Sequence, residues 1–159
     1  PTLELSKVFV ITSEDTCSAS EAIINALQGV DVEVIQIGST TCGKPYGFYP
    51  QDNCSVTYFT IQFKGVNAKG FGDYAYGFSP ENEVGSVGVK IKGCFANDDL
   101  NHELGNSSET SLAKVINYYL TESCDNPASL STSKQKKSKQ NAIKKYYIKK
   151  SMWHKNRIM

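Results

Sequence analysis

The sequence has 159 residues, of which 40% are hydrophobic and 21% are charged, and this is enough for one domain with a buried core. No stretch approaches the roughly 18 consecutive apolar residues that a membrane-spanning helix needs. The net charge of +1 hides an asymmetry, because residues 131–159 hold 10 of the 17 Lys and Arg and no Asp or Glu, which leaves a charge of −9 on residues 1–130. We expect one domain over residues 1–128 and a basic, low-complexity tail over residues 129–159. The chain enters its first strand soon after Pro1, which we interpret as the mark of a fragment.

Three elements at the start of the chain predict a βαβ unit. Residues 7–12 (KVFVIT) form a short β-branched run typical of a buried strand. Apolar residues then follow helical spacing over residues 20–27, and Gly29 ends the helix. A second strand is predicted over residues 32–38 (VEVIQIG). Two strands joined by a helix within about 30 residues should lie parallel.

The second half is less regular. Alternation over residues 55–63 predicts a half-exposed strand, residues 65–83 predict a long irregular segment, and residues 84–91 predict a strand weakened by glycine. A helix should begin at Ser107 or Ser108, with an apolar face formed by Leu112, Val115, Ile116 and Tyr119. We therefore expect an α/β fold whose second half is antiparallel or irregular.

The tail is basic and poor in hydrophobic residues, so it buries too little surface to offset the entropy of ordering. Its lysines and aromatic residues could contact nucleic acid or anionic lipid. A solvated extension is the interpretation we prefer, and we expect no nucleic-acid partner.

The five cysteines lie at positions 17, 42, 54, 94 and 124 and form no CxxC pair or zinc spacing. Cys42 and Cys54 flank one loop and could be bridged in an oxidising compartment. Five buried thiols are the alternative. An odd number leaves at least one cysteine outside any internal disulfide.

Two loops carry the residues of greatest chemical interest. Ser18 lies six residues after the end of the first strand, and Lys44 lies six residues after the end of the second. Both loops should leave the carboxyl edge of a parallel sheet, where open α/β sheets place their ligand sites. A serine hydroxyl becomes a nucleophile when a base such as a neutral lysine amine takes its proton. The amide of Ala19 would then face a developing oxyanion, Gly43 would let the backbone approach a substrate, and Pro45 would fix the turn after Lys44.

A structural interpretation of both residues stands beside this one. Ser18-x-x-Glu21 before an apolar run fits a capping box, in which serine and glutamate satisfy backbone amides. Lysine in a glycine-containing loop is usually a solvated charge. Ser20 could serve as the alternative cap.

The segment VFVITSEDTCSASEAIINAL…VEVIQIGSTTCGKPYG resembles the S41 serine peptidases, the C-terminal processing or tail-specific peptidases. The resemblance covers residues 7–50 and continues more weakly through residues 93–120. In that family a strand precedes S-A-S-E at a helix start, and a later strand ends in G-x-x-T-x-G-K. The resemblance implies a crotonase/ClpP-like core, Ser18 as nucleophile, Lys44 as general base and the amide of Ala19 as an oxyanion donor.

The third catalytic residue differs between versions of the family. One version has a glutamate three residues after the serine, which matches Glu21. A second has a glutamine four residues after the lysine, where this chain has Phe48. A third has an aspartate near the helix end, which Asp31 matches only roughly. The family's upstream glycine-rich oxyanion segment and its PDZ domain have no counterpart in these 159 residues.

The resemblance also implies a function. We expect a Ser/Lys endopeptidase acting on non-folded or C-terminally tagged polypeptides, without a cofactor, outside the cytoplasm of a bacterium. A catalytically incomplete peptide-binding relative is the alternative. An α/β domain whose basic tail makes the contacts is a second alternative.

Two further groups of residues could be functional. Asp98, Asp99 and His102 could bind a metal ion, but at these spacings a turn with polar surface is the preferred interpretation, and no metal is expected. Four aromatic residues could line a peptide groove, but packing beneath a long loop is preferred: Phe71, Tyr74, Tyr76 and Phe78.

Overall fold

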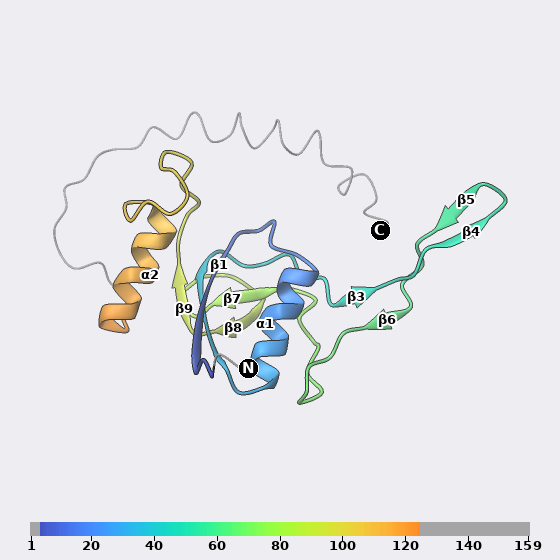
Figure 1. Ribbon diagram of the computed structural model, residues 1–159, viewed down its shortest axis with the longest axis horizontal. Coiled ribbons are helices and arrows are strands. Elements are labelled where there is room, and N and C mark those ends of the chain that lie inside the picture. Colours follow the sequence, from blue (N-terminus) through green and yellow to red (C-terminus); the bar gives the residue numbers. More distant parts are fainter. Residues whose placement is uncertain (1–3, 125–159) are drawn as a thin grey trace. The chain divides into compact units, whose positions relative to one another are not determined.

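A parallel three-stranded sheet forms the centre of the structure (Figure 1). Strands β1 (Lys7–Thr12) and β2 (Glu33–Gly38) pair in parallel, from Lys7 opposite Glu33 to Thr12 opposite Gly38. Helix α1 (Ala19–Gly29) connects them, which confirms the predicted βαβ unit. Strand β9 (Gly93–Phe95) lies parallel to β2 on its other side, so β2 is central. This position explains why β2 is buried from Val34 to Gly38.

The computed structural model describes residues 4–124, which belong to one compact unit. The predicted tail over residues 129–159 lies outside the described residues. Neither helix in the described part is long and apolar enough to cross a membrane.

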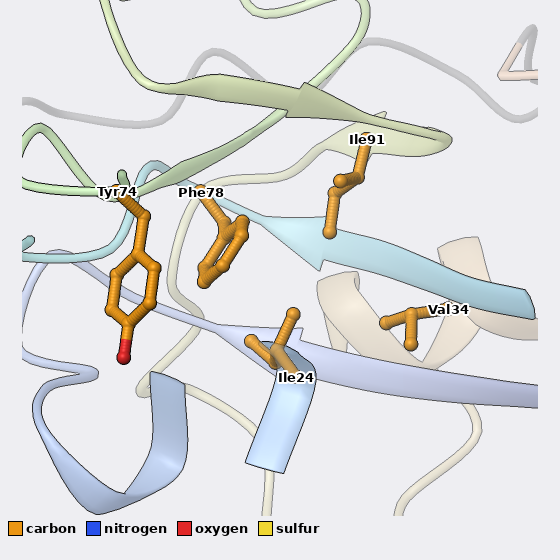
Figure 2. Close-up of a cluster of buried hydrophobic side chains, with 5 residues drawn as sticks. All are labelled: Ile24, Val34, Tyr74, Phe78 and Ile91. Carbon is orange, nitrogen blue, oxygen red and sulfur yellow. The ribbon is translucent and has the colours of Figure 1, made fainter. Parts of the chain in front are cut away.

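Alternate side chains of β2 enter two hydrophobic clusters, as the period of a strand requires. Val34 belongs to a cluster with Ile24, Tyr74, Phe78 and Ile91 (Figure 2). The second cluster contains Ile35, Ile37, Cys94 and Ala96. Residues of α1 contribute to the first cluster and residues of α2 (Thr110–Thr121) pack against the second. The two helices therefore cover opposite faces of the sheet.

A buried glutamine joins the sheet to the loops at its carboxyl edge. Gln36 is fully buried on β2, and its Nε2 donates hydrogen bonds to Thr12 Oγ1, Ser39 O and Phe78 O at 2.9–3.0 Å. These bonds satisfy the buried amide nitrogen and fix the ends of β1 and β2 against the strand that begins at Phe78.

The predicted strand over residues 55–63 is wrong in its extent. Strands β4 (Gln51–Asn53) and β5 (Val56–Tyr58) form an antiparallel hairpin, while β3 (Tyr46–Gly47) pairs with β6 (Phe63–Lys64). The hairpin turn is residues 54 and 55, which both have positive φ, as type I′ turns require. All residues from 51 to 66 are exposed. The alternation in this segment thus belongs to an exposed two-stranded ribbon.

The remaining strands also differ from the expectation. Strand β7 (Phe78–Pro80) lies inside the segment predicted to be irregular, and it pairs with β8 (Val89–Ile91) in parallel. The β2–β9 pair is parallel as well, so the second half is not simply antiparallel or irregular. Three of the four aromatic residues, Phe71, Tyr74 and Phe78, pack in or against the first cluster, whereas Tyr76 is exposed.

Helix α2 begins later than predicted. Its N-cap is Glu109, whose carboxylate accepts hydrogen bonds from the amides of Ser111 and Leu112. The cap is therefore neither Ser107 nor Ser108. Val115 and Tyr118 pack toward the sheet, and the Tyr119 ring meets Phe9 of β1 edge-to-face although most of Tyr119 is exposed. Ile116 is exposed, so the apolar face differs from the predicted one at Ile116 and includes Tyr118.

Two disulfides connect distant parts of the described chain. Cys94 in β9 is bonded to Cys124 after α2, and Cys17 is bonded to Cys42. Cys54 is a free thiol at the exposed hairpin turn. The predicted Cys42–Cys54 bridge is therefore wrong, and so is the alternative of five buried thiols. The hairpin carries Cys54 into solvent, while Cys42 meets the loop before α1.

The core around Phe78 provides a first test. Phe78 is fully buried and stacks on Tyr74 with ring centroids 4.8 Å apart. We expect Phe78→Ala to lower the free energy of unfolding by about 3–5 kcal/mol, because it removes buried contacts and leaves a cavity. Val84 is 98% exposed, so Val84→Ala should change it by less than about 0.5 kcal/mol. Denaturant titration measures both, and equal losses in the two variants would contradict this account of the core.

Candidate functional site

Ser18 occupies a strained turn between β1 and α1. Its φ of 55° and ψ of −108° lie outside the regions that L-residues normally adopt, and it is exposed. The turn is held locally: Ser13 N–H donates to Thr16 Oγ1, and Ser20 N–H donates to Cys17 O. Such a conformation persists only where surrounding contacts enforce it, and it is frequent at functional sites.

The carboxylate of Glu21 is the centre of these contacts. Glu21 is fully buried in the first turn of α1. Its Oε2 accepts the amide N–H of Ser18 at 3.0 Å and that of Lys44 at 2.8 Å. Its Oε1 accepts the amide N–H of Gly43 at 2.7 Å and the hydroxyl of Thr41. Glu21 thus joins the two loops through their backbones.

The loop that carries Lys44 is fixed by neighbours on its other side. Thr41 N–H donates to Phe78 O, and Phe78 N–H donates to Thr41 Oγ1. Gly43 has a φ of +79°, and a Cβ there would lie 2.2 Å from Ala75 O. The close backbone approach at Gly43 is therefore to residue 75 of the same chain. Pro45 is buried directly after the lysine.

A disulfide also connects the two loops. Cys17 directly precedes Ser18, and Cys42 lies two residues before Lys44; their Cα atoms are 5.3 Å apart. Beside it, Cys42 N–H donates to Thr16 O at 3.0 Å. The structure therefore brings together the turn of Ser18 and the loop of Lys44, as the topology of the sheet predicts.

The Lys44 side chain is half-buried, and its Nζ lies 5.9 Å from the centre of the Phe48 ring. This is within the range of a cation–π contact. Phe48 is half-buried and meets Phe59 edge-to-face, so the ring is held in place. Tyr46 is 41% exposed.

Asp31 is not placed to assist these residues. It follows the C-terminal end of α1, whereas Ser18 precedes the N-terminal end, so about 16 Å of helix separates them. The Asp31 carboxylate forms an exposed ion pair with Lys69. Of the two acids considered from the sequence, only Glu21 reaches both loops.

A cavity of about 210 Å³ opens at the same carboxyl edge of the sheet. The cavity is lined by residues at or after the ends of β1, β2 and β9 and by one residue in the first turn of α2. These residues include Thr12, Ser13, Thr16, Ser39, Ala96 and Ser111. None of these six residues is among the site residues predicted from the sequence. The position of Thr12, Ser39 and Ala96 at or directly after strand ends is the signal that could have found them.

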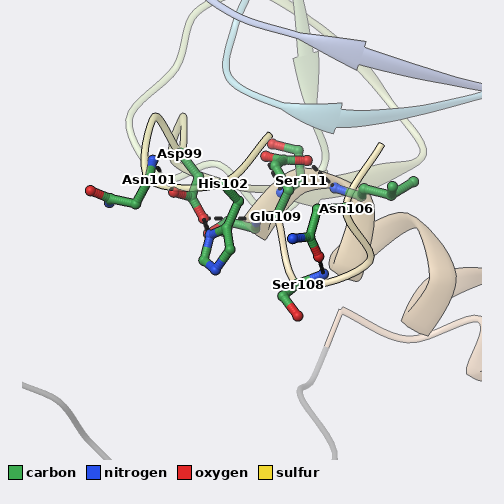
Figure 3. A network of polar contacts seen from close by, with 9 residues as sticks. Asp99, Asn101, His102, Asn106, Ser108, Glu109 and Ser111 are labelled. Atoms are coloured by element: carbon green, nitrogen blue, oxygen red, sulfur yellow. Dashed lines mark hydrogen bonds and ion pairs between the residues drawn. The ribbon is translucent and has the colours of Figure 1, made fainter. Parts of the chain in front are cut away.

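The segment considered as a metal site forms a turn that leads into α2 (Figure 3). Asp99 accepts hydrogen bonds from the amides of Asn101 and Thr110 and contacts His102 Nδ1 at 2.8 Å. These bonds, the Asn101 amide first and His102 next, hold the pKa of Asp99 well below its usual value. Within residues 4–124 no group of three His, Cys, Asp or Glu side chains is arranged to hold a metal ion.

The Glu21 contacts predict a large effect of a small substitution. In Glu21→Gln one carboxylate oxygen becomes an NH₂ group. Each oxygen accepts two hydrogen bonds, so two donors lose their acceptor whichever oxygen is replaced. We expect the free energy of unfolding to fall by about 3 kcal/mol, because buried donors lose their acceptor. The amides of Gly43 and Lys44 should also exchange their hydrogens faster. The control is Glu81→Gln at an exposed position, and a loss no greater than in that control would refute the role given to Glu21.

Asp99 provides a pH-dependent test. A carboxyl whose folded-state pKa is lowered stabilises the protein above its unfolded pKa, and this contribution is lost as the pH falls through the folded pKa. Asp99→Asn should therefore cost about 1–2 kcal/mol near neutral pH, and the difference from wild type should shrink below about pH 4. Asp98→Asn, at an exposed position, serves as control. A deficit that stays constant down to acidic pH would be inconsistent with this account.

Comparison with known proteins supports the fold. No protein-family model matches the sequence, and no curated protein matches it. Among solved structures, the 2.00 Å crystal structure of a "Putative S41 protease" from Bacteroides fragilis NCTC 9343 is similar, with a TM-score of 0.61 and 26% sequence identity. The match covers 76% of this chain and 29% of that chain, so this chain spans less than a third of the other's length. The chain therefore has a mixed α/β fold that is S41-like.

Proposed function

We propose that this chain carries the nucleophile and the general base of a serine peptidase of the S41 type. One observation carries the proposal: the strained turn of Ser18 and the loop of Lys44 bind the same carboxylate oxygen, Glu21 Oε2, at the carboxyl edge of a parallel sheet. A capping serine needs no strained backbone and no partner loop. A nucleophile needs both exposure and a base nearby.

In the proposed reaction Ser18 Oγ attacks the carbonyl carbon of the scissile peptide bond, and Lys44 Nζ accepts the hydroxyl proton. The carbonyl oxygen becomes an oxyanion that accepts a hydrogen bond from Ala19 N–H, which is free of helix bonding because it lies in the first turn. The C–N bond then breaks, and Lys44 returns the proton to the leaving amine. Water hydrolyses the acyl–serine by the same route.

Glu21 has a positioning role in this proposal. Its carboxylate binds the backbone amides of Ser18 and Lys44, so it fixes the backbone positions from which the nucleophile and the base extend. Proximity and orientation of this kind can supply a large part of a catalytic effect.

The wider setting follows from the same proposal. We propose that the fold has a crotonase-like core and that the substrates are non-folded or C-terminally tagged polypeptides. Two disulfides within residues 4–124 favour an oxidising compartment, in keeping with a site of action outside the bacterial cytoplasm.

The test is a pair of substitutions in the polypeptide that carries this sequence. Ser18→Ala and Lys44→Met should each lower kcat for hydrolysis of an unfolded protein by about a thousandfold or more, because each removes a group that acts in the bond-breaking steps. Ser20→Ala, at an exposed position in the first turn of α1, is the matched control and should retain activity. Product formation is followed by mass spectrometry.

Substantial turnover in either variant would overturn the proposed dyad. Peptide binding by the wild type without any hydrolysis would instead favour the peptide-binding relative. Circular dichroism of all three variants checks that the fold is retained.

A further inference from the structure

Cys17 and Cys42 lie where a covalent link would act directly on the proposed chemistry. One is the residue before Ser18, and the other is two residues before Lys44. The second disulfide, Cys94–Cys124, connects β9 to the end of α2 and includes no residue of these two loops. The described part of the chain therefore offers both a bond at the site and a matched bond away from it.

We propose that the Cys17–Cys42 disulfide is a positioning device for the Ser18–Lys44 pair, so that its reduction lowers hydrolysis while the domain stays folded. This inference rests on the proposed function of the same site. It adds redox state as a condition for activity.

The backbone of Ser18 explains why the bond matters. A residue with a φ of 55° and a ψ of −108° returns to a commoner conformation unless its neighbours prevent it. Cys17 is the neighbour on the N-terminal side, and the disulfide anchors it to the loop of Lys44. Opening the bond releases one of the two sides on which Ser18 is held.

The remaining contacts explain why the domain should survive reduction. Glu21 still accepts the amides of both loops, and Cys42 N–H still donates to Thr16 O. The core clusters lie on the two faces of the sheet and contain neither Cys17 nor Cys42. Reduction should thus loosen the geometry of the pair without removing the fold.

The two disulfides also differ in exposure. Cys17 and Cys42 are both half-buried, whereas in the other disulfide Cys124 is half-buried and Cys94 is completely buried. Thiol–disulfide exchange requires access of a thiolate to a sulfur atom. A dithiol such as dithiothreitol has two half-buried cysteines to attack in Cys17–Cys42 and one in Cys94–Cys124, so Cys17–Cys42 should open first.

The redox step is balanced by that reagent. One thiolate of the reagent attacks the sulfur of one cysteine and forms a mixed disulfide with it, and the second cysteine leaves as a thiolate that takes a proton. The second thiol of the reagent then attacks the mixed disulfide, closes the ring of the oxidised dithiol and releases the first cysteine as a thiol. Two electrons pass from the dithiol to the Cys17–Cys42 bond.

The experiment uses a Cys54→Ser background, because the free thiol at the hairpin turn could exchange with either disulfide. The protein is titrated with dithiothreitol, and mass spectrometry after thiol alkylation shows which bond is open. We expect opening of Cys17–Cys42 to lower kcat by about tenfold or more while KM changes by less than about threefold, because misplacement of reacting groups acts on the chemical step. Reoxidation should restore kcat.

Two double variants separate position from stability. Cys17→Ser/Cys42→Ser should have the low kcat of the reduced protein and should not respond to dithiol. Cys94→Ser/Cys124→Ser should keep the response, although its unfolding midpoint should fall. If this control does not fold, the selective stage of the titration provides the same comparison.

Unchanged kcat after verified opening of Cys17–Cys42 would overturn the inference and leave the proposed function standing. If the wild type hydrolyses no polypeptide in either state, the proposed function fails, and hydrogen exchange then decides the inference. Faster exchange at the amides of Ser18, Gly43 and Lys44 on reduction, with β1 and β2 unchanged, would support the positioning role. No change at those amides would refute it.

Discussion

The geometry of the site depends on one buried carboxylate. Glu21 is completely removed from solvent, and an ionised group in that position is tolerated only when its lone pairs are satisfied. Four donors satisfy it, and they come from the head of α1 and from the loop after β2. The requirement to satisfy one charge therefore becomes a requirement that two loops meet. The parallel sheet brings the loops to one edge, but Glu21 determines how they face each other.

The cap and the catalytic interpretation of Ser18-x-x-Glu21 are compatible in this structure. Glu21 does accept the amide of Ser18, as a capping box requires. The same oxygen also accepts the amide of Lys44, which a simple cap does not involve. The motif that starts the helix is thus also the attachment point for the second loop. A local signal in the sequence carries a non-local function here, and the two could not be separated by inspection of the motif alone.

The parts of the fold that the sequence predicts are those determined by local patterns. The β1–α1–β2 unit follows from periodicity, and the meeting of the Ser18 and Lys44 loops follows from parallel topology. The cap of α2 was missed because Glu109 is an unusual N-cap with two serines before it. The partner of Cys42 could not be found from spacing, since Cys17 is 25 residues away and only the folded sheet brings the two together. The strand over residues 55–63 was overextended because an exposed ribbon and a half-buried strand share the same alternation.

Glu21 fixes the backbone of the lysine loop, so something else must place the amine. One contact of the amine is with Phe48, whose ring centre lies 5.9 Å from Lys44 Nζ. An aromatic ring restrains the amine by packing and by its quadrupole, and it has no lone pair that would compete for the proton. In the proposed reaction, which moves one proton from Ser18 to Lys44 and then to the leaving amine, such a neighbour would orient the amine and would favour the protonated form that follows the first transfer. The Glu21 carboxylate thus holds the backbone of the lysine loop, and the Phe48 ring is one contact of the lysine side chain.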